Sequence, residues 1–432
     1  MSPIIILVVF FSTLWGFVFF RQRALNMGVL ISTVWAVAAW AGFLYYTSPR
    51  YETDAELYGI CAYQPFFYLF ILYLIVFLPI WAFRTDRLQR IELLPFSIIK
   101  LIVIVYAIAS LCFVLFWLRP ALDSLFMGVG ANRDLVLEDL GGSVSAPLLI
   151  RAGIGIRSCF NLLSYFLLFY LLAFYRKHKF LIVLLAVCIY FPNFLVVLGV
   201  SSRSEIVFTL MNSIAGFVFF RKFIPQNLKR KILLSCFVIG GGFIGILVCI
   251  TLIRFSGGRY DGLFGVFRYA GESFINFNIL AYDKVVNFTG GPNLFPHLSL
   301  LWGIDLEYFR NLPVVDQTLF LLEYSQLNVD AAVFYTVLGD LYIAYGPCLS
   351  IVVLTSISFL LFVYLRKSEN GSLAKIIIFQ LYFAFFYSGV FYCPIRSFAG
   401  ERMIVCMLML SLFFALRQQG KKMLWSDEVK EL

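Results

Sequence analysis

The sequence predicts an all-α protein that crosses a lipid bilayer about eleven times. Three observations support that prediction: the composition, the length of the apolar runs and the placement of the basic residues. Of the 432 residues, 62% are hydrophobic and 13% are charged, and the mean hydropathy is +0.90. Soluble domains are only about half apolar, so no water-soluble fold could bury this much apolar surface. The composition therefore excludes a soluble enzyme.

The apolar runs are long enough to cross about 30 Å of hydrocarbon as helices. In chain order they cover residues 4–20, 24–46, 61–83, 93–118, 155–175, 180–198, 206–220, 232–253, 344–365, 376–393 and 403–416. The first run follows Met1-Ser2-Pro3, which lacks the basic leader of a secretory signal. We therefore expect this run to be retained as a membrane span.

Lys and Arg cluster in alternate connections between these runs, at 21–23, 84–90, 176–179, 221–231 and 366–375 and in the tail after 417. Basic residues are retained on the cytoplasmic side of short loops. The alternation supports the span count and predicts an outer N-terminus and a cytoplasmic C-terminus. The net charge of +10 then reflects membrane topology and does not indicate nucleic-acid binding.

The chain is expected to form one integral membrane domain over 1–432, with two long outer connections at 119–154 and 255–343. The second begins with glycines and aromatic residues such as Gly257, Phe264 and Tyr269, which predict amphipathic helices lying on the outer leaflet. The nine cysteines form no CxxC pair and no His spacing suited to zinc, so we expect no metal site. We expect the function to reside in the outer connections.

The cations of the outer connections are nearly all Arg. Arg203 and Glu205 lie in a connection too short to leave the membrane rim, and Arg157, Arg254 and Arg402 lie near the ends of other runs on the same side. Charges near the hydrocarbon edge are costly, which favours a shared ligand or an ion-pair network. Guanidinium groups bind phosphate oxygens bidentately, so a diphosphate fits, and structural pairing with outer acids is the alternative. For Glu205 we expect an ion pair or a cap at a helix start.

Two segments resemble motifs of the Wzy-type O-antigen and oligosaccharide repeat-unit polymerases of bacterial inner membranes. Ser201-Ser202-Arg203-Ser204 is similar to a Gly-Ser-Arg-Ser-like turn that opens a span, with Ser201 in the place of Gly. The tract 335–346 is similar to one that precedes a late span in the family. The resemblance covers most of the chain and implies a fold similar to the GT-C-like lipid-linked glycan polymerases.

The resemblance implies transfer of a growing glycan from one undecaprenyl diphosphate onto the non-reducing end of a second lipid-linked repeat unit. No cofactor, metal or nucleotide sugar is expected. The implied partners are the undecaprenyl-diphosphate-linked oligosaccharide and membrane lipid, with a chain-length regulator as a potential protein partner and no nucleic acid.

Such a site must stabilise negative charge on the leaving diphosphate and can remove a hydroxyl proton from the acceptor. The residues expected to bind the substrate are all arginines: Arg203, Arg254, Arg157, Arg402, Arg259, Arg268 and Arg396. The candidate bases are Glu272, Asp340 and His297, of which Asp340 could instead cap the helix that follows it and His297 could be an ordinary loop histidine.

Two other functions fit many apolar helices. An O-antigen ligase or another lipid-linked glycan transferase would use the same chemistry with a different acceptor. A secondary transporter would need ionisable groups near the midplane of the membrane and usually broken helices in two related halves. The charges gather at one rim and the sequence shows no internal repeat, which favours the transferases.

Overall fold

The computed structural model describes residues 2–48, 51, 60–127, 147–200, 203–235, 240–242, 245, 262–282, 294, 335–366, 370–391, 393–394, 397–417 and 423–425. The helices that build the molecule are α1 (Ile4–Gln22), α2 (Met27–Tyr46), α4 (Tyr63–Ala82), α5 (Phe96–Met127), α7 (Leu148–Phe174), α8 (Lys179–Val200), α9 (Arg203–Phe220), α11 (Gly262–Asn276), α15 (Val337–Leu365), α16 (Leu373–Ser388) and α17 (Phe398–Leu416).

Within these residues, eight helices are long and apolar enough to cross a membrane: α1, α2, α4, α5, α7, α8, α15 and α17. The prediction of a helical, multi-pass membrane protein is therefore confirmed. The expected spans at 206–220 and 376–393 are apolar helices that are shorter, Ser204–Phe220 and Leu373–Ser388. The expected span at 232–253 lies largely outside the described residues, so the count of about eleven stays a prediction.

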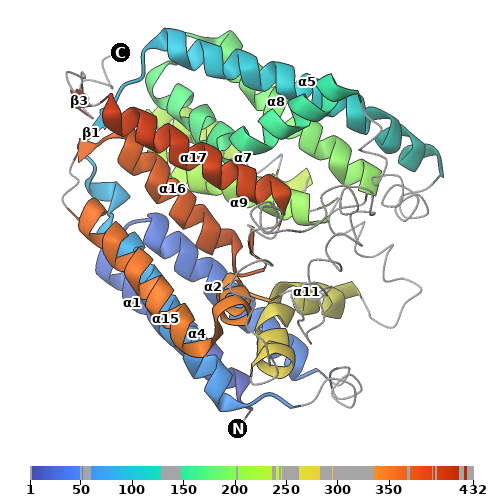
Figure 1. Ribbon diagram of the computed structural model, residues 1–432, viewed down its shortest axis with the longest axis vertical. Helices are drawn as coiled ribbons and strands as arrows, with labels where there is room; N and C mark the ends of the chain where they lie inside the picture. Colours follow the sequence, from blue (N-terminus) through green and yellow to red (C-terminus); the bar gives the residue numbers. More distant parts are fainter. Residues whose placement is uncertain are drawn as a thin grey trace, which may run out of the picture.

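The helices run side by side in one general direction (Figure 1). On one side of the bundle α1 packs on α2 and α4, and α4 packs on α15. On the other side α5 packs on α7 and α8, and α9 completes the group against α7. Helix α16 contacts both sides and α17, so the bundle is continuous.

Trp35 of α2 lies at the centre of the hydrophobic core. Its side chain is completely buried, and its indole Nε1 donates a hydrogen bond to the carbonyl of Phe386 in α16 at 3.0 Å. Its ring packs against Phe11, Tyr73 and Phe274. A buried donor needs a partner inside the protein when lipid surrounds it. This bond joins α2 to α16 through two residues that are 351 positions apart in the chain.

The described connections rich in Lys and Arg gather at one end of the bundle, which we call the basic end; it comprises 21–26, 83–95, 175–178, 221–225, 366 and 370–372. A three-stranded sheet lies there. Strand β1 (Arg90–Glu92) pairs parallel with β2 (Asn370–Gly371) and antiparallel with β3 (Met423–Trp425). The sequence did not predict these short strands, because strands of two or three residues carry no readable alternation.

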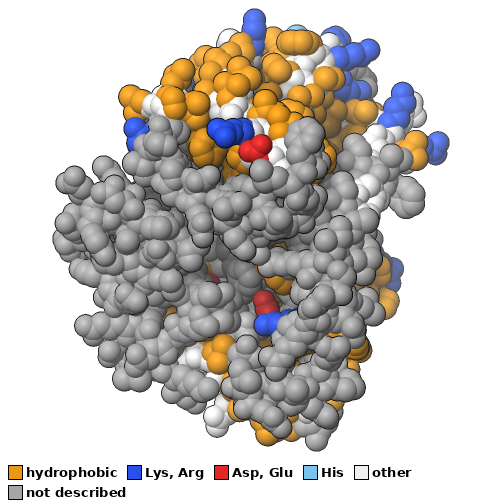
Figure 2. Space-filling model, turned by 90° about the vertical axis from the view of Figure 1, so that its right-hand side faces the viewer, with side chains coloured by type: hydrophobic (Ala, Val, Ile, Leu, Met, Phe, Trp, Pro, Cys, Tyr) orange, Lys and Arg blue, Asp and Glu red, His pale blue; other side chains and the backbone are white. Residues whose placement is uncertain are grey.

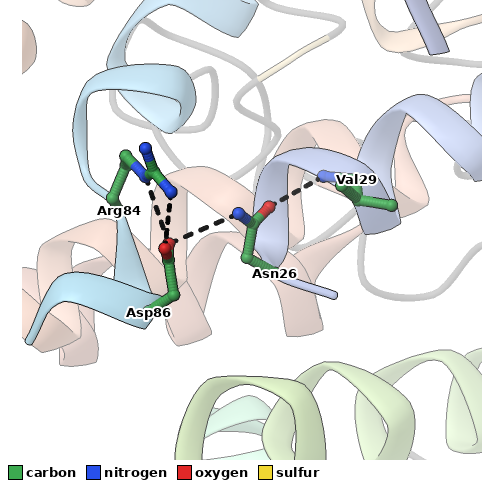
Figure 3. Close-up of polar contacts among 4 residues, drawn as sticks. All are labelled: Asn26, Val29, Arg84 and Asp86. Atoms are coloured by element: carbon green, nitrogen blue, oxygen red, sulfur yellow. Dashed lines mark hydrogen bonds and ion pairs between the residues drawn. The ribbon is translucent and has the colours of Figure 1, made fainter. Parts of the chain in front are cut away.

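Side chains also join separate connections at the basic end (Figure 3). Asn26 caps α2, where its Oδ1 accepts from the Val29 amide at 3.0 Å, and its Nδ2 donates to Asp86 at 3.4 Å. Arg84 pairs with the same carboxylate, with Nη2 at 2.6 Å from Oδ2. The start of α2 is thereby tied to the connection between α4 and α5.

At the opposite end of the bundle, the helices extend into segments expected to be loops. Helix α5 continues to Met127 and α7 begins at Leu148, so both ends of the expected outer connection 119–154 are helical. Helix α15 begins at Val337, within the expected connection 255–343. Residue Gly346 interrupts α15 with φ 77° and ψ 177°, just before Pro347. The hydropathy pattern did not predict this break.

Helix α11 lies at this opposite end and is amphipathic, as expected, but it is packed on the protein. It contacts α2, and Gly271 meets Gly42 so closely that a Cβ on Gly271 would lie 2.0 Å from the Gly42 nitrogen. Figure 2 views the molecule from the side on which α11 lies, where a few charged side chains stand among mainly hydrophobic ones in the described part.

Candidate functional site

Arg157 is a buried cation in the membrane-spanning helix α7. It lies about two and a half turns after Leu148, the first residue of the helix at the end opposite to the basic end. The residue is 5% exposed. Its Nη2 donates to Asn193 Oδ1 at 2.5 Å, and its guanidinium carbon lies 4.1 Å from the ring centroid of Phe113. Its Nε has no hydrogen-bond partner.

Asn193 connects Arg157 to a network of uncharged polar groups. Besides accepting from Arg157, its Nδ2 donates to the Tyr165 hydroxyl at 2.7 Å and to Thr209 Oγ1 at 3.0 Å. The Tyr165 hydroxyl donates to Thr209 Oγ1 at 3.2 Å. These residues come from α7, α8 and α9, and Pro192 precedes Asn193 inside α8. The network therefore fixes the position of the guanidinium between three helices.

Glu205 lies in the first turn of α9 and is half-buried. Burial raises the pKa of the Glu205 carboxyl above its ordinary value, and the nearby charge of Arg157 offsets part of that rise. Among the residues that the structure describes, however, no cation lies within 4.0 Å of it and no group donates a hydrogen bond to it. Among the described side chains the expected ion pair or helix cap at Glu205 is not found, and Arg157 lies near Glu205 without forming an ion pair with it.

Arg402 reaches the same part of α7 from α17. Its Nη1 lies 3.5 Å from the position that a Cβ on Gly155 would occupy, two residues before Arg157 in the helix. Residues two apart on a helix point in different directions. Arg402 and Arg157 thus lie at one level of α7, with Arg157 turned toward α5 and α8 and Arg402 exposed beside α17.

Arg268 and Glu272 form a separate group on α11. Arg268 Nε donates to Glu272 Oε2 at 3.1 Å, one turn apart in the helix. The side chains are 30% and 14% exposed. Helix α11 packs on α2, whereas Arg157 lies on α7. The candidate base Glu272 and Arg157 therefore belong to different parts of the bundle.

Asp340 is buried, 1% exposed, in the first turn of α15. Its Oδ2 accepts a hydrogen bond from the backbone amide of Cys393 at 3.2 Å. The cap of α15 is Thr336, whose hydroxyl accepts from the Gly339 amide at 3.1 Å, so Asp340 is not the cap. Its carboxylate instead joins the start of α15 to the segment after α16.

Four of the expected site residues, His297, Arg254, Arg259 and Arg396, lie outside the described residues. Arg203 is the first residue of α9, and its position is described through its backbone. Where the chain is described, no group of three or more His, Cys, Asp and Glu side chains could hold a metal ion.

Sequence reasoning found Arg157 but missed the residues that surround it. Asn193, Tyr165, Thr209 and Phe113 lie within apolar runs and carry no motif. A signal was present in Pro192-Asn193, since Asn is a rare residue inside a membrane helix and needs a partner there. The partner could not be named from the sequence, because it comes from another helix.

Comparisons with protein-family models, with curated proteins and with solved structures found no match for this chain.

Proposed function

We propose that this chain polymerises undecaprenyl-diphosphate-linked oligosaccharide repeat units into O-antigen or a related surface polysaccharide, at the periplasmic face of a bacterial inner membrane. The observation that carries the proposal is the incompletely bonded guanidinium of Arg157, buried in a membrane helix at the level of Arg402. A buried cation favours an anionic ligand, and a guanidinium suits phosphate oxygens.

The reaction needs cations where the leaving group departs. A hydroxyl of the acceptor unit attacks the anomeric carbon of the donor, and the bond to the lipid diphosphate breaks with its electron pair on the diphosphate oxygen. Arg157 and Arg402 would bind that diphosphate, and Arg203 is the first residue of α9 at the same end of the bundle. Fixed positive charge stabilises the charge that develops on the leaving group.

A secondary transporter is the second candidate, and two observations favour it. Helix α15 is broken at Gly346, and Arg157 is an ionisable group inside a membrane helix. Broken helices and buried charges are features of transporter sites. The break is occupied by the protein's own groups, since Ser350 Oγ lies 2.6 Å from the Gly346 carbonyl and Tyr68 donates to the Pro347 carbonyl at 2.8 Å. This favours the polymerase.

The test is the distribution of repeat units on surface glycan, resolved as a ladder on gels. Cells that lack this chain should show single attached units, and the wild-type chain should restore the ladder. Arg157→Gln and Arg203→Ala should abolish or shorten it, because each removes a diphosphate-binding cation. Arg119→Ala is the matched control, since the Arg119 side chain is 92% exposed at the same end of α5.

The alternatives give different results in the same cells. A ladder that persists without the chain excludes polymerisation and favours transport. Loss of all glycan attachment, with polymers accumulating on the lipid carrier, identifies a ligase. A full ladder from both arginine variants would remove the support that these side chains give to the polymerase.

A further inference from the structure

Glu205 differs from the other carboxylates described at its end of the bundle. Glu272 pairs with Arg268, Asp340 accepts from the Cys393 amide, and Asp123 lies 3.7 Å from Arg119. Glu205 is half-buried, and no described group donates to it or pairs with it. In the described part of the chain, no group occupies the lone pairs of its carboxylate.

The neighbouring cation is also incompletely satisfied. Arg157 gives one hydrogen bond to Asn193 and stacks on Phe113, while its buried Nε has no partner. Burying a charge without full pairing costs stability. An ion pair between Arg157 and Glu205 could relieve this cost. The two side chains are near each other but form no ion pair. Such an arrangement is typical of a site that receives a substrate.

The hydrogen-bond network around Asn193 explains why Arg157 forms no ion pair with Glu205. Thr209 lies one turn after Glu205 on α9, and residues four apart share a helix face. Thr209 accepts from the same Asn193 amide group that binds Arg157 through its oxygen. Asn193 therefore holds Arg157 toward the turn of α9 that follows Glu205, and Tyr165 closes the network from α7. The guanidinium is therefore bonded to the side chain that also binds Thr209, one turn after Glu205 on α9.

We propose that Glu205 is the general base of the polymerisation reaction, a role that rests on the proposed function. Its carboxylate removes the proton from the attacking hydroxyl of the acceptor sugar. The hydroxyl oxygen forms the new bond to the anomeric carbon, the bond from that carbon to the diphosphate breaks, and the electron pair leaves with the diphosphate. The proton passes from Glu205 to water when undecaprenyl diphosphate is released, which restores the carboxylate.

The base role explains why Glu205 lies beside an arginine without pairing to it. A carboxylate in an ion pair has its lone pairs occupied and is a weaker proton acceptor. A carboxylate that forms no ion pair keeps a lone pair for the substrate. Arg157 at the same place can hold the leaving diphosphate, so one region supplies both functions that the reaction needs.

The experiment uses the purified full-length chain in liposomes with undecaprenyl-diphosphate-linked repeat units. Single-turnover elongation and binding of the lipid-linked donor are measured separately for the wild type and for Glu205→Gln, Glu205→Asp and Asp123→Asn. Glu205→Gln keeps the shape of the side chain and removes its basicity. It should slow elongation by about 100-fold or more, since general bases contribute about 10²–10⁴-fold, with donor binding changed less than about twofold. Glu205→Asp should retain part of the rate, and Asp123→Asn should match the wild type.

The outcomes separate the base assignment from the polymerase proposal. If the wild type elongates and Glu205→Gln elongates at the same rate, the base assignment is wrong and the polymerase proposal stands. If Glu205→Gln loses donor binding in proportion to rate, Glu205 binds substrate and is not the base. If the wild type releases no undecaprenyl diphosphate and makes no longer glycan, both are overturned. Thermal unfolding of each variant in detergent verifies that a loss of rate is not a loss of fold.

Discussion

At the scale of single residues, Asn193 is the group on which the buried arginine depends. It is the one side chain, among those described, that accepts a hydrogen bond from Arg157. Removing the acceptor leaves the guanidinium buried with fewer partners, and hydrogen bonds to charged groups contribute about 1.5–3 kcal/mol. We expect Asn193→Ala to lower the free energy of unfolding by about that amount, measured by reversible unfolding in mixed detergent micelles of increasing sodium dodecyl sulfate content.

The matched control is Asn161→Ala on the neighbouring helix α7. Asn161 Oδ1 is buried and has no hydrogen-bond partner, so its removal breaks no bond of that oxygen. We expect this variant to unfold at a detergent composition equal to or above that of the wild type. Equal destabilisation by the two substitutions would mean that the loss of packing, and not the bond to Arg157, accounts for the effect at Asn193.

The same residues show how far the sequence could lead. Arg157 was predicted as a functional residue because a cation close to a membrane run is conspicuous. Its depth and its bond to Asn193 were not predicted, since α7 and α8 meet only after folding. Glu205 was expected to be satisfied by a pair or a cap. Neither is found among the described residues, because the side-chain network directs Arg157 toward Asn193 and Phe113.

At the scale of helices, the contact of α2 with α11 depends on two glycines. A Cβ on Gly271 would meet the backbone nitrogen of Gly42 at 2.0 Å, and a Cβ on Gly42 would meet the Gly271 carbonyl at 3.1 Å. Overpacking of this kind costs about 1–3 kcal/mol. We expect Gly271→Ala to destabilise the protein in this range and Gly42→Ala to do so less. The measurement is detergent unfolding, together with hydrogen exchange of the α11 amides, which should become faster.

Gly16 of α1 provides the control for that series. A Cβ on Gly16 would meet no atom within 4 Å. Replacing a helical glycine by alanine at an open position favours the helix by about 0.8–1.0 kcal/mol. Gly16→Ala should therefore be neutral or stabilising. If Gly271→Ala behaved in the same way, α11 would not be held against α2 by this crossing.

The sequence predicted which segments form helices better than it predicted where the helices end or break. Apolar runs identified each of the eight helices that can span the membrane, because the length of hydrocarbon fixes the length of the run. The extension of α5 to Met127 and the break of α15 at Gly346 depend on packing and on Ser350 and Tyr68, which satisfy the carbonyls at the break. Such contacts leave no periodic pattern in the sequence.

At the scale of the whole molecule, the two ends of the bundle differ in kind. The basic end is tied together by a sheet, by the Asn26–Asp86–Arg84 contacts and by Glu92, whose Oε2 accepts from the Leu373 amide at 2.9 Å. Toward the opposite end lie Arg157 and Glu205, which are charged and incompletely paired. The sheet and these contacts hold the basic end together, and the proposed substrate site lies toward the opposite end.

That site can meet a periplasmic substrate only if the basic end faces the cytoplasm, and α7 offers a direct test. Its 27 residues rise about 40 Å, so its two ends lie on opposite sides of the membrane. In a chain whose native cysteines are replaced, Leu148→Cys and Lys177→Cys place single thiols at exposed positions, before and after the helix. A membrane-impermeant maleimide should label Leu148→Cys in intact spheroplasts and Lys177→Cys only after permeabilisation, because Lys and Arg are retained inside. The reverse pattern would place Arg157 and Glu205 nearer the cytoplasm and would exclude polymerisation at the periplasmic face.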